Sequence, residues 1–125
     1  MKLNDPSLLV TKAYLCGEWR DARSGRVMNV TNPATGELVA TVPELSADEA
    51  HEAIAFAAAC MKEWQKRSAL ERSKVLRRWF DLMIENAADL ALILTSEQGK
   101  PLAEARGEIL YGASYVEWFA EEAKR

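Results

Sequence analysis

Side chains that could serve as nucleophiles or general bases are few in this sequence and stand apart from one another. The single histidine, His51, falls in the first turn of a predicted helix, and no partner is spaced to form a nucleophilic pair or a metal site with it. Cys16 lies in a strand-like run, and Cys60 lies on the flank of an alanine-rich helical pattern. A catalytic thiol needs a partly exposed, electropositive setting. We therefore interpret both cysteines as small buried side chains and His51 as an exposed helix residue.

Carboxylates and glycine-rich loops offer no stronger candidate for catalysis. Glu117, Glu121 and Glu122 stand at the end of the last predicted helix, where a solvated face is the common reason for such a cluster. Neither Gly-x-Gly-x-x-Gly nor Gly-x-x-x-x-Gly-Lys-Ser/Thr occurs, so no phosphate-binding loop is predicted. The sequence thus predicts no catalytic residue and no cofactor-binding residue within the chain.

The composition argues against two classes of partner. The 125 residues carry a formal charge of -3, whereas nucleic acid requires a basic face. The basic run from Arg72 to Arg78 is interpreted as a solvated helix face, because Glu71 and Asp81 offset its charge. No apolar run approaches the roughly 20 residues of a membrane span, and the first residues form no secretory signal. With no metal motif or disulfide framework, the sequence predicts a reduced, cytoplasmic protein that binds neither nucleic acid nor membrane.

Two kinds of residue pattern divide the chain near position 45. Before it, the sequence predicts short strands separated by turn-like runs, at Tyr14–Trp19, 27–30 and 38–42. We expect these strands to form a small antiparallel meander, which is too small to be stable without a helical partner.

From Ser46 onward, the apolar positions recur with a helical period. Ser46 with Glu49 and Ser68 with Glu71 match capping boxes, which predict the starts of two helices.

A third, shorter helix is predicted to begin at Asn86, with Asp89 in its cap, and to end at Gly99. In the last predicted helix, Gly107 and Gly112 indicate that another helix approaches closely.

These patterns predict an α+β fold that is mainly α, with a short antiparallel strand meander followed by about four helices. Residues 1–45 are assigned to the strand region and residues 46–125 to the helical region of one unit. The last helix runs to Lys124-Arg125 without a glycine, a proline or a polar tail. We therefore expect the chain to be the first part of a longer protein.

Two segments carry a specific resemblance to a known family. The first comprises Gly17-Glu18-Trp19 and the run from Val30 to Glu37, VTNPATGE. The second runs from Glu97 to Ala105, EQGKPLAEA, and continues through Gly107-Glu108-Ile109. In this order and spacing they are similar to the amino-terminal part of the NAD(P)-dependent aldehyde dehydrogenases. The ending from Tyr115 to Arg125, YVEWFAEEAKR, most resembles the succinate-semialdehyde dehydrogenase type. The resemblance implies that the chain is the amino-terminal part of a Rossmann-like cofactor-binding domain.

The same resemblance implies a chemistry whose groups are absent here. In the family, a cysteine thiolate attacks the aldehyde carbon and the thiohemiacetal transfers a hydride to the nicotinamide of NAD or NADP. A glutamate then activates the water that hydrolyses the thioester. The family's nucleophile follows a Gly-Gln pair, which this sequence lacks, and neither Cys16 nor Cys60 matches it. The resemblance thus implies a parent enzyme that oxidises succinate semialdehyde or a similar aldehyde to the acid, and a chain that alone is inactive and binds no cofactor.

The resemblance also implies two sets of site residues. In relatives the last helix lines the substrate entrance, which implies that role for Glu108, Gly112 and Tyr115. Many relatives bind a structural monovalent cation, and the corresponding oxygens here are the Thr31 carbonyl and the Glu97 carboxylate. For both sets, simple packing stays open as the alternative.

Three functions remain open on the sequence alone. The first is a part of a cytoplasmic, homo-oligomeric aldehyde dehydrogenase that acts on a small aldehyde. The second is a stand-alone helical oligomerisation or binding module, whose apolar stripes pair with one another. The third is a residual enzyme that uses Cys60.

Overall fold

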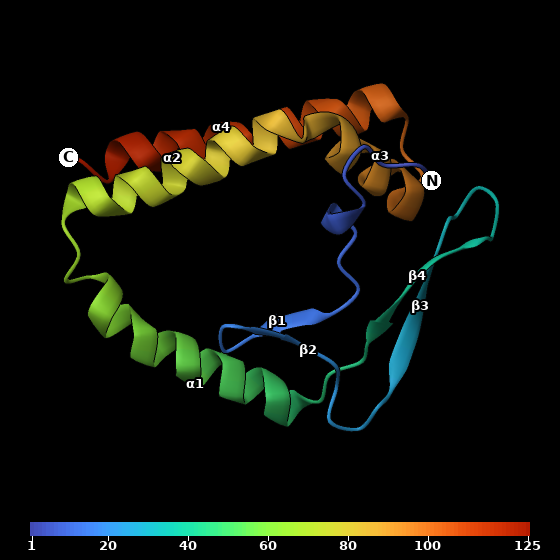
Figure 1. Cartoon of the computed structure of the whole chain (residues 1–125), viewed down its shortest axis with the longest axis horizontal. Helices are drawn as coiled ribbons and strands as arrows, with labels where there is room; N and C mark the ends of the chain where they lie inside the picture. The colour runs from blue at the N-terminus through green and yellow to red at the C-terminus, as the bar shows by residue number, and fades with distance from the viewer.

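The computed structural model describes all of residues 1–125 and is mainly helical, with two small pairs of strands (Figure 1). The elements in chain order are the 3-10 helix η1 (Pro6–Leu8), the strands β1 (Ala13–Leu15), β2 (Glu18–Arg20), β3 (Val27–Thr31) and β4 (Leu38–Pro43), and the helices α1 (Ala47–Trp64), α2 (Ala69–Glu85), α3 (Ala87–Gln98) and α4 (Leu102–Glu122). The α+β class predicted from the sequence, mainly α with four helices, is confirmed.

The strands form two separate antiparallel hairpins, where the sequence predicted one meander. The run Tyr14–Trp19, predicted as a single strand, reverses direction at Cys16 and Gly17, whose φ angles are 55° and 87°. Two consecutive positive φ angles are the geometry of a tight two-residue hairpin turn. β1 therefore pairs only with β2, and β3 pairs with β4 across the turn that contains Gly36.

Both predicted capping boxes are present. At the start of α1, the Ser46 hydroxyl accepts the Glu49 N–H, and the Glu49 carboxylate accepts the Ser46 N–H. Ser68 and Glu71 repeat this arrangement at the start of α2. Each box satisfies two N–H groups that a helix end leaves without partners, which explains why these helices begin where they do.

The predicted cap of α3 is wrong. The Asn86 side chain makes no capping hydrogen bond, and its amide group donates instead to the Leu82 carbonyl of α2. Asn86 ends α2 as well as preceding α3, and its φ and ψ of -106° and 13° differ from the extended backbone of an N-cap. The Asp89 carboxylate instead accepts hydrogen bonds from Asn4 and Asp5 at the start of the chain.

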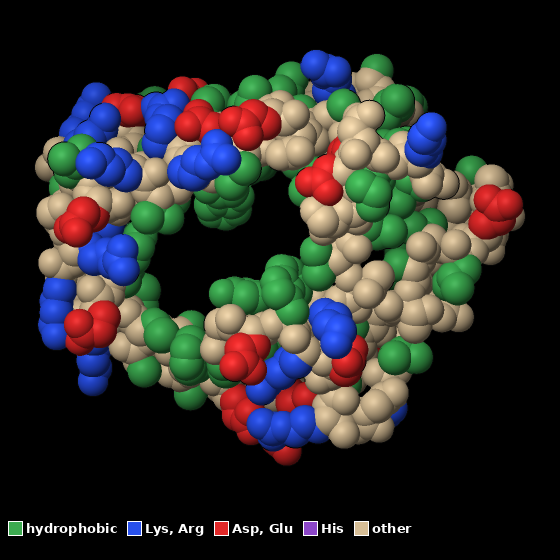
Figure 2. Space-filling view, in the orientation of Figure 1, with side chains coloured by type: hydrophobic (Ala, Val, Ile, Leu, Met, Phe, Trp, Pro, Cys, Tyr) green, Lys and Arg blue, Asp and Glu red, His purple; other side chains and the backbone are tan.

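The helices are unequally packed. α2 and α4 lie side by side, and α3 packs against α4 at one end of the pair, close to β3 (Figure 1). α1 lies across the molecule from them and packs extensively against no other helix or strand. Figure 2 shows an opening between these parts that is bordered by many hydrophobic side chains. None of the helices has the length and apolar character that crossing a membrane requires.

The contacts between elements bury little apolar surface. The buried hydrophobic residues are all alanines, among them Ala105, Ala113 and Ala120 of α4. Trp79 and Trp118, by contrast, are more than half exposed. A self-contained protein of 14.0 kDa exposes roughly 6,700 Å², whereas this chain exposes 8723 Å². The excess of total surface is roughly 2,000 Å². The many exposed large hydrophobic side chains show that much of the uncovered surface is apolar.

Candidate functional site

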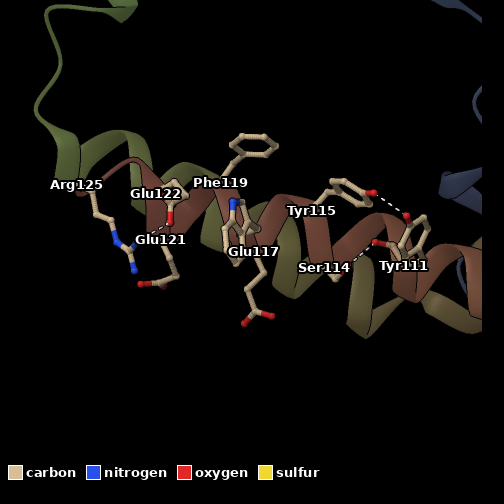
Figure 3. Close-up of a pocket in the computed structure, with 9 residues that line it drawn as sticks. Tyr111, Ser114, Tyr115, Glu117, Phe119, Glu121, Glu122 and Arg125 are labelled. Atoms are coloured by element: carbon tan, nitrogen blue, oxygen red, sulfur yellow. Dashed lines mark hydrogen bonds and ion pairs between the residues drawn. The ribbon is translucent and has the colours of Figure 1, made fainter.

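A shallow groove of about 670 Å³ follows the exposed side of α4 (Figure 3). Its apolar part consists of Tyr111, Tyr115, Trp118 and Phe119. All its lining residues belong to α4 or to the three residues that follow, so the groove lies between side chains that project from one helix. It therefore offers a ligand one wall of a site.

Two tyrosines one helical turn apart dominate the groove. The hydroxyl oxygens of Tyr111 and Tyr115 are 2.6 Å apart, and the rings meet edge to face with their centroids 5.0 Å apart. This hydrogen bond, with a smaller contribution from burial, raises the pKa of Tyr115. The phenol therefore stays protonated at neutral pH, where it can donate a hydrogen bond but cannot act as a general base.

The three residues predicted at a substrate entrance occupy different settings. Glu108 forms an ion pair with Lys100, whose side chain is only 17% exposed. Gly112 faces α2, where a Cβ atom in its place would lie 3.8 Å from the Met83 Cε. Of the three, Tyr115 alone lines the groove. The close approach predicted at Gly107 is wrong, because nothing lies within 4 Å of a Cβ placed there.

The two predicted cation donors flank a contact between α3 and the turn after β3. Gly99 has a φ of 83°, and a Cβ atom in its place would lie 2.7 Å from the Pro33 Cγ. Pro33 lies two residues after Thr31, and Gly99 lies two residues after Glu97. The Glu97 side chain is exposed. Oxygen donors beside a helix C-terminus suit a hard cation. Such an ion takes about six oxygens or more, so two donors are only part of a site.

The thiols and the histidine belong to no metal-binding cluster. Both cysteines are free; Cys16 is half-buried and Cys60 is exposed. The prediction that Cys60 is buried is wrong, because no other element packs extensively against α1. His51 is exposed, as predicted. No group of three or more His, Cys, Asp or Glu side chains is placed to hold a metal ion.

A bridge between α2 and α4 was missed by the sequence analysis. The two terminal nitrogens of Arg77 lie 2.7 Å from Glu117 Oε1 and 2.6 Å from Glu121 Oε1. The guanidinium also lies 5.2 Å from the centre of the Phe80 ring. These hydrogen bonds raise the pKa of Arg77. Interpreting the basic and acidic runs as separate solvated faces was therefore wrong for Arg77, Glu117 and Glu121. The spacing of Glu117 and Glu121, one helical turn apart on the same side of the helix, was the sequence signal that could have indicated a shared basic partner.

The sequence and the fold match a known family. Residues 19–125 match the sequence model of the aldehyde dehydrogenase family. The chain belongs to the aldehyde dehydrogenase family. The resemblance found in the sequence is confirmed.

This aldehyde dehydrogenase chain has similar relatives among enzymes that act on semialdehydes. It is 56% identical over 125 residues to the glutarate-semialdehyde dehydrogenase of Pseudomonas putida, covering 100% of this chain and 26% of the relative. It is 52% identical, with the same coverage, to the NADP-dependent succinate-semialdehyde dehydrogenase of Escherichia coli. The crystal structure of succinate-semialdehyde dehydrogenase from Burkholderia pseudomallei matches with a TM-score of 0.96 and 56% identity, covering 100% of this chain and 26% of that one. The chain thus spans about a quarter of the length of the curated relatives that it matches.

Proposed function

We propose that this chain works as the amino-terminal part of an NAD(P)-dependent enzyme that oxidises a short semialdehyde, such as succinate semialdehyde, to the acid. The observation that carries the proposal is that the whole chain matches enzymes of this kind but corresponds to only 26% of their length. Residues 1–45 and 46–125 then form the strand and helical regions of one amino-terminal unit. Its uncovered apolar surface supports the proposal, because the rest of such an enzyme would cover it.

The substrate class follows from the names of the relatives. Succinate and glutarate semialdehydes both carry a carboxylate at the end opposite the aldehyde, and we propose a substrate of this type. The E. coli relative is named as NADP-dependent, which supports a nicotinamide as the hydride acceptor. The thiolate, the general base and the dinucleotide site belong to the remaining part of the enzyme. The chain by itself is therefore inactive and binds no cofactor.

The proposed contribution of α4 is to border the substrate entrance. Tyr115 and Glu108 present polar groups on the exposed side of the helix, and Gly112 allows α4 to lie close to α2 at Met83. The Lys100 ammonium offsets the Glu108 charge, which would otherwise repel an anionic semialdehyde.

We also propose that the Thr31 carbonyl and the Glu97 carboxylate contribute two ligands to a monovalent cation site. The packing of Pro33 on Gly99 supports this placement, because it fixes the turn after β3 against the end of α3. The remaining oxygens come from outside this chain.

Assembly and location complete the proposal. The large uncovered surface supports a homo-oligomer, in which further copies cover part of it. The free thiols of Cys16 and Cys60 support a reducing compartment, and we propose the cytoplasm. No nucleic acid or membrane partner is proposed, in line with the chain's charge of -3.

A hybrid enzyme tests the proposed function. Residues 1–125 replace the corresponding segment of the E. coli succinate-semialdehyde dehydrogenase, and NADPH formation is followed with succinate and glutarate semialdehydes. We expect kcat/KM within about tenfold of the unmodified enzyme for one of the two. The unmodified E. coli enzyme and the isolated chain are the controls, and the isolated chain should form no NADPH. A hybrid that assembles and binds NADP but turns over neither aldehyde would contradict the proposal.

The competing function is a stand-alone helical binding or oligomerisation module. The exposed apolar side chains of α1, such as Ile54 and Met61, favour it, because no other element packs extensively against them. A residual enzyme that uses Cys60 is the remaining alternative. Aldehyde-dependent NADPH formation by the isolated chain that disappears in Cys60→Ala would favour this last function over the other two.

A further inference from the structure

The first nine residues form a strap that crosses α3 (Figure 1). None of residues 1–9 is buried, and η1 within the strap buries no side chain. At the start of the strap, the Met1 sulfur lies 3.3 Å from the Ser96 hydroxyl of α3. Leu3, Leu8 and Leu9 are half-buried, so apolar contact also helps to hold the strap in place.

A single carboxylate of α3 makes the main polar contact with the strap. Asp89, which is 5% exposed, accepts the Asn4 N–H at 3.1 Å and the Asn4 side-chain amide at 2.9 Å on one oxygen. Its other oxygen accepts the Asp5 N–H at 2.8 Å. Hydrogen bonds to a charged acceptor are stronger than neutral ones, and here three converge on a side chain 84 or 85 positions away. The Asp5 bond, followed by those from Asn4, lowers the pKa of Asp89.

The strap also closes one side of a small pocket of about 170 Å³. Met1 and Leu9 of the strap line it, together with Ser96 of α3 and residues Asn32, Glu37, Leu38 and Val39 of the β3–β4 hairpin. Asn32 and Ser96 are the sequence neighbours of Thr31 and Glu97, so the pocket occupies the corner where the proposed cation donors lie.

We propose that residues 1–9 are a lid over this pocket, latched by the Asp89 carboxylate, that opens as a unit while α2, α3 and α4 stay folded. Opening requires the loss of three hydrogen bonds and the exposure of three half-buried leucines, whereas unfolding the helices requires the separation of α2 from α4. The proposal stands independently of the proposed enzyme function.

Hydrogen exchange read by mass spectrometry tests the latch in the 125-residue chain at low micromolar concentration. Asp89→Asn keeps the shape of the side chain but replaces a charged acceptor oxygen with a donor. We expect the peptide covering residues 1–9 to exchange at least about tenfold faster in this variant, with the peptides of α2 and α4 unchanged. Asp81→Asn, which makes the same change on α2, is the matched control and should exchange like the wild type.

The lid is tested separately through the pocket it covers. In a chain with both native cysteines changed to serine, a Val39→Cys thiol should react faster with a maleimide when Asp89→Asn is added. Unchanged labelling would overturn the lid, and unchanged exchange in residues 1–9 would overturn the latch.

A third measurement keeps the proposal testable if Asp89→Asn unfolds the whole chain. In the wild type, the exchange of residues 1–9 should depend less on urea than that of α2 and α4, because a local opening exposes less surface than the separation of these helices. A common urea dependence for both would show that the lid has no opening of its own.

Discussion

Single carboxylates join parts of this chain that are far apart in sequence. Glu49, which is 2% exposed, accepts the Ser46 N–H at 2.9 Å with one oxygen and the Arg23 N–H at 3.0 Å with the other. One side chain therefore both caps α1 and fixes the loop after β2. The bond from Ser46, followed by that from Arg23, lowers the pKa of Glu49 to about 2.

This low pKa predicts a pH dependence of stability. Because the folded value of about 2 lies below the usual 4.5, the ionised Glu49 stabilises the fold above pH 4.5, and this contribution disappears as the pH falls from 4.5 to 2. We expect the melting temperature of the wild type to exceed that of Glu49→Gln at pH 6 and the two to converge near pH 2. Thermal melts followed by circular dichroism measure the difference.

Glu71→Gln is the matched control for that experiment. Glu71 completes the same kind of capping box in α2, and its pKa is also lowered, but it holds no distant loop. Its difference from the wild type should be smaller at pH 6. A Glu49→Gln difference that stays constant from pH 6 to pH 2 would refute the assignment.

At the level of the elements, the contact between Gly99 and Pro33 joins α3 to the β3–β4 hairpin. Gly99 needs its left-handed backbone to end α3, and it needs its missing side chain to admit the Pro33 ring. Gly107 has neither need, because it lies inside α4 with nothing within 4 Å. The surroundings of Gly99 therefore require glycine, whereas those of Gly107 do not.

These constraints predict opposite effects of the same substitution. Gly99→Ala should destabilise the chain by at least about 1 kcal/mol, because the left-handed backbone strains a Cβ atom and Pro33 must move. Gly107→Ala should stabilise it by ~0.5–1 kcal/mol, because alanine favours a helix interior. Urea unfolding followed by circular dichroism measures both. Equal effects of the two substitutions would contradict the geometry described for Gly99.

The sequence predicted those elements whose signals are local. The capping boxes and the end of α3 at Gly99 depend on residues within a few positions, so their patterns are visible in the sequence. The Asp89 bond to the strap and the Arg77 bridge join segments 40 or more positions apart, which no local pattern encodes. The turn at Cys16 was missed because a cysteine rarely adopts a positive φ. The implied entrance and cation residues stay predictions.

At the level of the whole molecule, the uncovered apolar surface is the dominant property. The excess of total exposed surface, roughly 2,000 Å², is larger than the approximately 800 Å² that each partner contributes to a standard interface. Exposed residues on α1, α2 and α4 contribute to it, among them Ile54, Trp79 and Trp118. Contact between copies would remove this surface from water.

We therefore expect the isolated chain to self-associate. Its weight-average mass in light scattering should rise above 14.0 kDa as the concentration increases. Ile54→Lys should weaken the association. Ala59→Lys adds the same charge at another exposed position of α1, on a different side of the helix, and should not weaken it. A compact monomer at high concentration would contradict the expectation.

The alanines at the helix contacts have a consequence for how this chain tolerates change. Ala105, Ala113 and Ala120 are completely inaccessible, so the side chain at each position already has nearly the smallest possible volume. A further reduction in size removes one methyl group at most, whereas any enlargement must push neighbouring helices apart. These contacts therefore tolerate a decrease in side-chain size much better than an increase. In most protein interiors, the damaging substitutions are those that replace a large side chain with a small one and leave a cavity. At these three positions such substitutions are almost impossible, so nearly all damaging variants will be those that add atoms.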